Sequence, residues 1–265
     1  HAAVVVAVMV SGAFIENSVY KLIELALTHI PLDCLIARLI RDIQSWYSKD
    51  YIDGDRDSWK STLARIQSNY GYDKFPGNCH VVPNHALIIL ALLFGNGDFD
   101  LSMEIVNTSG WDTDCNSGNV GAILGVLNGL DCFSGKKDWR GPVADQILIP
   151  TADGASCVTD AVKIAKNICN LSARLYDQPD FYPEHKWFDF TFQGSTQGFK
   201  AAHVEPNAEG KCIVRNISDD DKSRRGLKVT IPKRSRPQIY RVYTPTFPDH
   251  EQLNLEGYGL VCCPT

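Results

Sequence analysis

Apolar residues recur at helical spacing from residue 2 to about residue 176 of this 265-residue sequence. Side chains three and four positions apart share one face of a helix, and an apolar face must be buried against another element. Breakers at Pro31 and at residues 53–55, 75–77 and 95–98 divide the region, with helices expected over about 55–69, after residues 80–82, and from about 100 and 114. The pattern therefore predicts a bundle of amphipathic helices. Its clearest stripes are Leu22, Ile23, Leu25, Ala26 and Ile30, and Leu35, Ile36, Leu39, Ile40, Ile43 and Trp46.

The helical periodicity of the sequence ends near residue 177. Residues 178–183, Gln-Pro-Asp-Phe-Tyr-Pro, are typical of a linker. Beyond them, short runs rich in β-branched and aromatic residues alternate with turn residues. The sequence predicts a helical domain over residues 1–177 and a small all-β domain over residues 186–265. The four expected strands cover residues 187–192, 211–217, 227–231 and 238–243.

Composition and charge exclude several classes of protein. The formal net charge of −5 and the pI near 5.8 disfavour a nucleic acid partner, which usually requires a basic face. The nine cysteines form no C-x-x-C pair, and reduced, mostly buried thiols favour a cytoplasmic protein. The apolar run over residues 2–10 is too short to span a membrane, and no basic segment precedes it. We interpret it as a buried helix whose upstream partner is missing, so the chain is expected to be a fragment.

The most informative motif covers residues 110–116, Gly-Trp-Asp-Thr-Asp-Cys-Asn. It places two carboxylates, Asp112 and Asp114, two positions apart ahead of a helix. Crowded negative charge is costly unless a cation neutralises it, and Mg²⁺ prefers carboxylate, hydroxyl and water oxygens. The alternative is that these side chains simply cap the free amides of the helix.

Four glycines follow this motif along one helix face, Gly118, Gly121, Gly125 and Gly129. Each costs about 1 kcal/mol of helix stability relative to Ala. Close approach of a neighbouring helix would offset that cost, so we expect a crowded interface behind the acidic motif.

The motif resembles the G-[GW]-D-T-D-[TC]-N signature of the ADP-ribosylglycohydrolases, and the small-residue helix after it is similar to the family's continuation. The resemblance extends over about residues 2–175 and implies the C-terminal part of the family's catalytic domain. It implies that Asp112, Asp114 and Cys115 are ligands of a pair of Mg²⁺ ions. Cys115 stands where Thr is commoner, and a thiol is a poor ligand for Mg²⁺. The family's other ligands come from a Thr-Asp-Asp motif that has no counterpart in this sequence.

Residues 80–84, His-Val-Val-Pro-Asn, are similar to another helix start of the family, and we take His80 and Asn84 as candidate substrate-binding residues. His85 could also reach a ligand, although a lone histidine is more often structural. Asp53, Asp55 and Asp57 resemble the start of a calcium-binding loop, but that loop's required Gly and Glu are absent.

These observations predict a mainly α fold, an orthogonal helical bundle followed by a small all-β domain. The resemblance implies a Mg²⁺-dependent hydrolase that removes ADP-ribose from modified protein or small-molecule substrates, with no membrane partner and a cytoplasmic location. The catalytic residues themselves cannot be assigned from the sequence. Because the Thr-Asp-Asp motif is missing, the alternative is a truncated, non-catalytic family member with a binding or structural role.

Overall fold

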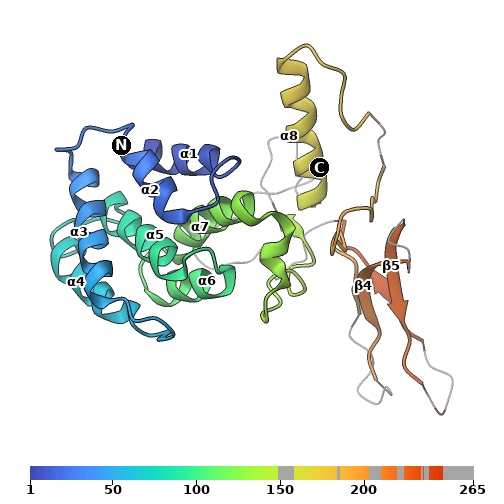
Figure 1. Ribbon diagram of the computed structural model, residues 1–265. Coiled ribbons are helices and arrows are strands. Elements are labelled where there is room, and N and C mark those ends of the chain that lie inside the picture. The colour runs from blue at the N-terminus through green and yellow to red at the C-terminus, as the bar shows by residue number, and fades with distance from the viewer. Residues whose placement is uncertain are drawn as a thin grey trace. The chain divides into compact units, whose positions relative to one another are not determined.

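The computed structural model describes residues 1–148, 158–183, 186–202, 210–219, 224–233, 235 and 239–246. The chain divides into two compact units, residues 1–137 and 138–265. Within the described residues the fold is mainly α with a small β region, which confirms the predicted fold class (Figure 1). The domain boundary that we place near residue 177 stays a prediction.

The first unit is built of helices whose ends follow the sequence breakers. Asp98 begins one of them by accepting a hydrogen bond from the Leu101 amide at 2.9 Å. Asn96 ends the preceding helix in the left-handed conformation, with φ of 43°. The helices are α1 (Ala2–Gly12), α2 (Val19–Leu27), α3 (Leu35–Asp50), α4 (Trp59–Tyr70), α5 (Val81–Gly95), α6 (Phe99–Thr108) and α7 (Thr113–Asn128), and the 3₁₀ turn η1 (Gly129–Ser134) follows them.

Helix α5 is the centre of the first unit (Figure 1). It contacts α3, α4, α6 and α7 along its length and also touches α1 and α2. All its residues after Val81 are buried, as expected for a helix that is apolar on every side. The start of this central helix and the start of α7 together position the candidate site.

The glycine face of α7 approaches a neighbour at one position only. A Cβ built on Gly121 would lie 3.0 Å from the Met103 Cε of α6, whereas at Gly118, Gly125 and Gly129 it would meet nothing within 4 Å. The expectation of close packing along the whole face is therefore wrong at three of the four glycines. Helices α6 and α7 do contact each other.

In its described residues, the second unit combines one helix with short antiparallel strand pairs. Helix α8 (Ala161–Leu175) is capped by Asp160, whose carboxylate accepts a hydrogen bond from the Lys163 amide at 3.0 Å. The strand pairs are β1 (Gln146–Leu148) with β2 (Val158–Asp160), β3 (Lys200–Ala201) with β6 (Val242–Tyr243), and β4 (Ile213–Ser218) with β5 (Arg225–Thr230).

The predicted strands are only partly confirmed. The runs over 211–217 and 227–231 correspond to β4 and β5, and the run over 238–243 retains two residues in β6, with residue 238 outside the described residues. The strand over 187–192 is wrong. There the Asp189 carboxylate accepts from both the amide and the hydroxyl of Thr191, and this local turn competes with strand pairing.

Candidate metal centre

A strained turn carries the acidic motif to the start of α7. Gly110 and Trp111 both have positive φ, 86° and 61°. For a bulky residue such as Trp111 this conformation costs about 1–3 kcal/mol, so surrounding contacts must hold it. One such contact is the edge-on packing of the Trp111 ring against Tyr72, with 5.4 Å between ring centroids.

Asn84, in the first turn of α5, holds the turn at Gly110 and Trp111 in place through hydrogen bonds. Its side-chain oxygen accepts from the Asp112 amide at 3.1 Å and from the Asn116 side chain at 3.0 Å. Its nitrogen donates to the Tyr72 hydroxyl at 2.7 Å and to the His80 carbonyl at 3.0 Å. Asn84 is 6% exposed, so the candidate substrate-binding residue lies beneath the acidic motif with both ends of its amide engaged.

The structure brings the three predicted metal ligands together. The ligand atoms of Asp112, Asp114 and Cys115 all lie within 4.8 Å of one another. Asp112 is half-buried, while Asp114 and Cys115 are exposed. Asp112 occupies the N-cap position of α7, yet its side chain forms no capping hydrogen bond there. The Cys115 amide in the first turn nevertheless contributes to lowering the pKa of the Asp112 carboxyl, so this carboxylate faces both the helix start and the cluster.

Mutual proximity also determines the protonation of this cluster. The Asp114 carboxyl and then the Cys115 thiol are within reach to donate hydrogen bonds to Asp112, and they lower the pKa of Asp112. The same Asp112 carboxylate raises the pKa of the Cys115 thiol. A divalent cation would offset the repulsion between two neighbouring carboxylates.

Cys79 lies near the Asp112 carboxylate, outside the group of three ligand atoms, and the sequence analysis did not predict this. It directly precedes the start of α5, is exposed, and has φ of 53°. The adjacent Asp112 carboxylate raises the pKa of the Cys79 thiol. The available sequence signal was a cysteine next to the motif at residues 80–84, but its position 33 residues before Asp112 gave no sign of the contact.

The two histidines of α5 have different environments. His80 is half-buried at the helix start, where its Nδ1 accepts from the Val82 amide at 3.1 Å. His85 is 2% exposed, and its Nε2 has no hydrogen-bond partner among the described residues. Burial lowers the pKa of His85 to about 4, so its ring is neutral near pH 7. This burial supports a structural role for His85 over a contact with a ligand.

The comparison with known families bears on the same residues. The sequence profile of the ADP-ribosylglycohydrolases matches residues 1–177, which include the acidic motif and both ends of α5. The chain belongs to the ADP-ribosylglycohydrolase family. The resemblance drawn from residues 110–116 is thereby confirmed. No curated protein and no solved structure matches the chain.

Membership makes this chain a hydrolase of the ADP-ribosylglycohydrolase type, from a metal-dependent family that acts on ADP-ribosylated substrates. The donor atoms around the acidic motif of this glycohydrolase fit Mg²⁺ only in part. The two carboxylates supply oxygens of the kind that Mg²⁺ binds. The thiols of Cys115 and Cys79 do not, because Mg²⁺ is a hard ion.

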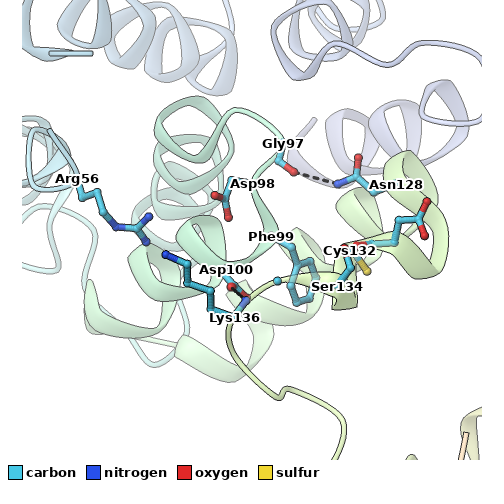
Figure 2. Close-up of a pocket in the computed structure, with 11 residues that line it drawn as sticks. Arg56, Gly97, Asp98, Phe99, Asp100, Asn128, Cys132, Ser134 and Lys136 are labelled. Carbon is cyan, nitrogen blue, oxygen red and sulfur yellow. Dashed lines mark hydrogen bonds between the residues drawn. The ribbon is translucent and has the colours of Figure 1, made fainter. Parts of the chain in front are cut away.

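A hollow of the glycohydrolase lies at the end of α7 opposite to the acidic motif (Figure 2). It measures about 610 Å³ and is bordered by the start of α6 and by η1. The Asn128 side chain donates to the Gly97 carbonyl at 2.9 Å across one edge. This hollow contains none of the residues of the acidic cluster, so cavity size alone would not have found the candidate centre.

No helix in the described part of the glycohydrolase is long and apolar enough to cross a membrane.

Proposed function

We propose that this protein is a Mg²⁺-dependent hydrolase that removes ADP-ribose from modified protein or small-molecule substrates, with Asp112 and Asp114 as metal ligands. The observation that carries the proposal is the pair of carboxylates whose oxygens converge within 4.8 Å at the start of α7. Family membership supports the class of reaction.

The residues that contact the acidic motif would hold its geometry during turnover. Asn84 fixes the main chain at Asp112, and the Trp111–Tyr72 contact supports the left-handed turn beside it. The free amides at the start of α7 add a positive field that favours the two carboxylates. Asn84 acts in this proposal through the acidic motif, because both ends of its amide are already hydrogen-bonded.

His80 is the proposed contact with the substrate from this chain. Its Nδ1 caps α5, which leaves Nε2 as the ring atom for an ADP-ribose hydroxyl or phosphate oxygen. When bound, Mg²⁺ would supply orientation of ribose hydroxyls and of water, and would stabilise charge as the bond at the anomeric carbon breaks. The carboxylates of Asp112 and Asp114 would hold the ion in place.

The test measures release of ADP-ribose from a modified protein across a Mg²⁺ titration. The double variant Asp112→Asn, Asp114→Asn should lose activity by about 100-fold or more, because each substitution removes a charged ligand. A matched control is Asp55→Asn, Asp57→Asn, a pair with the same spacing directly ahead of α4. Undiminished release by the Asp112 and Asp114 variant would refute the proposal.

A non-catalytic binding protein is the second candidate. The absence of a Thr-Asp-Asp motif from the sequence favours it, because half of the family's ligand set then has no counterpart. Calorimetry with ADP-ribose, with and without Mg²⁺, separates the two roles. Binding without turnover supports this second candidate, and Mg²⁺-dependent turnover contradicts it.

We also propose a cytoplasmic location and no nucleic acid partner. Free thiols among the described residues suit a reducing compartment, and they include Cys34, Cys79, Cys115, Cys169 and Cys212. The net charge of −5 disfavours binding to a phosphate backbone. Fractionation of cells that express the protein checks the compartment, and gel-shift assays with DNA and RNA check the second point.

A further inference from the structure

Strands β4 and β5 of the second unit form an antiparallel pair with two different faces (Figure 1). On one face, the Asn216 side chain donates to the Phe190 carbonyl at 2.8 Å and accepts from the Gly194 amide at 3.0 Å, which attaches the pair to the rest of the unit. Every second side chain of β4, starting at Ile213, is exposed. We define the outer face of β4–β5 as Ile213, Arg215 and Ile217 together with the residues opposite them, Thr230, Lys228 and Gly226.

Two cations stand directly opposite each other on the outer face. The register pairs Arg215 of β4 with Lys228 of β5, and both residues are exposed. Side chains at directly opposite positions have Cβ atoms about 5 Å apart, and like charges there are destabilising. The ion pairs among the described residues include neither Arg215 nor Lys228. An anion bound between the two cations would offset their repulsion.

Apolar side chains border the cation pair on the same face. Ile213 is 47% exposed and Ile217 is 39% exposed, and each lies two positions from Arg215 along β4. Gly226 is opposite Ile217, and a Cβ built on Gly226 would meet nothing within 4 Å, so the space beside Ile217 is open. Along β4 the outer face therefore presents an apolar, a cationic and an apolar side chain at steps of about 7 Å.

Charge and composition indicate what this face can bind. Residues 211–233 contain seven Lys or Arg and three Asp, although the whole chain has a net charge of −5. The three Asp are consecutive at 219–221, so all the charged residues within β4 and β5 are cations. Neither strand has an aromatic residue on which a nucleobase could stack, as proteins that bind single-stranded nucleic acid provide. Cations beside exposed isoleucines suit a peptide that carries both carboxylates and aliphatic side chains.

We propose that the outer face of β4–β5 binds an extended acidic segment of a partner protein, in which one carboxylate contacts both Arg215 and Lys228. Donors from Arg and Lys form charge-assisted hydrogen bonds with a carboxylate. An extended peptide returns to the same face every two residues, as β4 does. Aliphatic side chains two positions before and after the carboxylate therefore lie against Ile213 and Ile217.

This inference goes beyond the proposed function and does not depend on it. Strands β4 and β5 lie outside residues 1–177, the part of the chain that the family profile matches. Loss of peptide binding with intact release of ADP-ribose, or the reverse, distinguishes the two proposals.

The test titrates the full chain into a fluorescein-labelled peptide, Ser-Val-Ser-Glu-Ser-Val-Ser, and follows fluorescence anisotropy. The Glu and both Val share one face of this peptide when it is extended. Comparison probes carry Gln in place of Glu or Ser in place of both Val, and a labelled thymidine oligonucleotide of the same length tests nucleic acid. The variants are Arg215→Gln, Lys228→Gln and the double variant. The matched control is Arg225→Gln, which removes a cation opposite Ser218 on the attached face of the same strand pair.

Each single variant should bind the Glu peptide about fivefold more weakly, and the double variant about tenfold or more. The Arg225→Gln control should match the wild-type protein, the Gln peptide should bind as weakly as the double variant does, and affinity should fall as the NaCl concentration rises. Circular dichroism confirms that the variants are folded. Equal binding of the Glu and Gln peptides, an equal loss in Arg225→Gln and Lys228→Gln, or tighter binding of the oligonucleotide than of the Glu peptide would overturn the inference.

Discussion

Asn84 is the residue through which three segments of the first unit meet. Replacing it with Ala leaves the Asp112 amide and the Asn116 side-chain nitrogen without their acceptor, and it frees the Tyr72 hydroxyl. Loss of a buried acceptor costs about 1–3 kcal/mol. Asn84→Ala should therefore lower the free energy of unfolding in urea by that amount and raise the Mg²⁺ concentration needed for half-maximal activity.

The control for this prediction is Asn69→Ala. Asn69 is exposed and donates only to the Arg65 carbonyl of its own helix at 2.8 Å, so its loss should change stability by less than about 0.5 kcal/mol. Equal effects of the two substitutions would show that Asn84 contributes nothing beyond a local hydrogen bond.

The pKa of His85 predicts how the free energy of unfolding depends on pH. Burial lowers its pKa in the folded protein to about 4, below the ordinary value of 6.5. Between these values the unfolded chain binds more protons than the folded one, so the free energy of unfolding should fall as pH drops from about 6.5 to about 4. In His85→Gln this part of the fall should be absent, whereas the exposed-site variant His29→Gln should retain it. Urea denaturation at pH 7, 6, 5 and 4 measures the difference, and identical profiles for wild type and His85→Gln would contradict the assignment.

Individual residues of the site differ in how far the sequence could predict them. Asp112 and Asp114 are two positions apart, so their convergence is a local property that a motif can carry. The anchoring role of Asn84 depends on hydrogen bonds to residues 28 and 32 positions away. The place of Cys79 depends on a left-handed loop residue that composition does not indicate. Non-local contacts of this kind arise only from the packing of α5 against α7.

At the scale of elements, α7 offers a comparison within a single helix. A Cβ at Gly125 meets nothing within 4 Å, whereas at Gly121 it lies 3.0 Å from the Met103 Cε. Gly125→Ala should raise the free energy of unfolding by about 0.5–1 kcal/mol through lower chain entropy. Gly121→Ala should gain less, because the end of the Met103 side chain must move. Urea denaturation of both variants gives the difference, and an equal or larger gain for Gly121→Ala would contradict the packing described for α6 and α7.

The helices were predictable because their apolar periodicity is strong and their ends carry local signals. The helix starts expected after residue 82 and near residue 100 lie within two residues of the observed starts at Val81 and Phe99, and capping by His80 and Asp98 explains both. The strands were harder to predict, since β1 and β2 have three residues each and lie in a region expected to be helical. Strands this short carry too few residues for an alternating pattern, and their pairing depends on the rest of the second unit.

At the scale of the whole molecule, the metal centre should couple to global stability. A cation that binds the folded chain and not the unfolded chain stabilises it by about 2.7 kcal/mol when its free concentration is about 100 times Kd. Thermal unfolding followed by circular dichroism should therefore show a higher midpoint in Mg²⁺ than in a chelator. The shift should vanish in Asp112→Asn, Asp114→Asn, because both carboxylates of the cluster are then neutral. It should persist in Asp55→Asn, Asp57→Asn, which removes the same charge from a loop outside the cluster. A midpoint shift of equal size in both double variants would mean that the ions act through general screening of charge, and Asp112 and Asp114 would then be an acidic helix start without a resident metal.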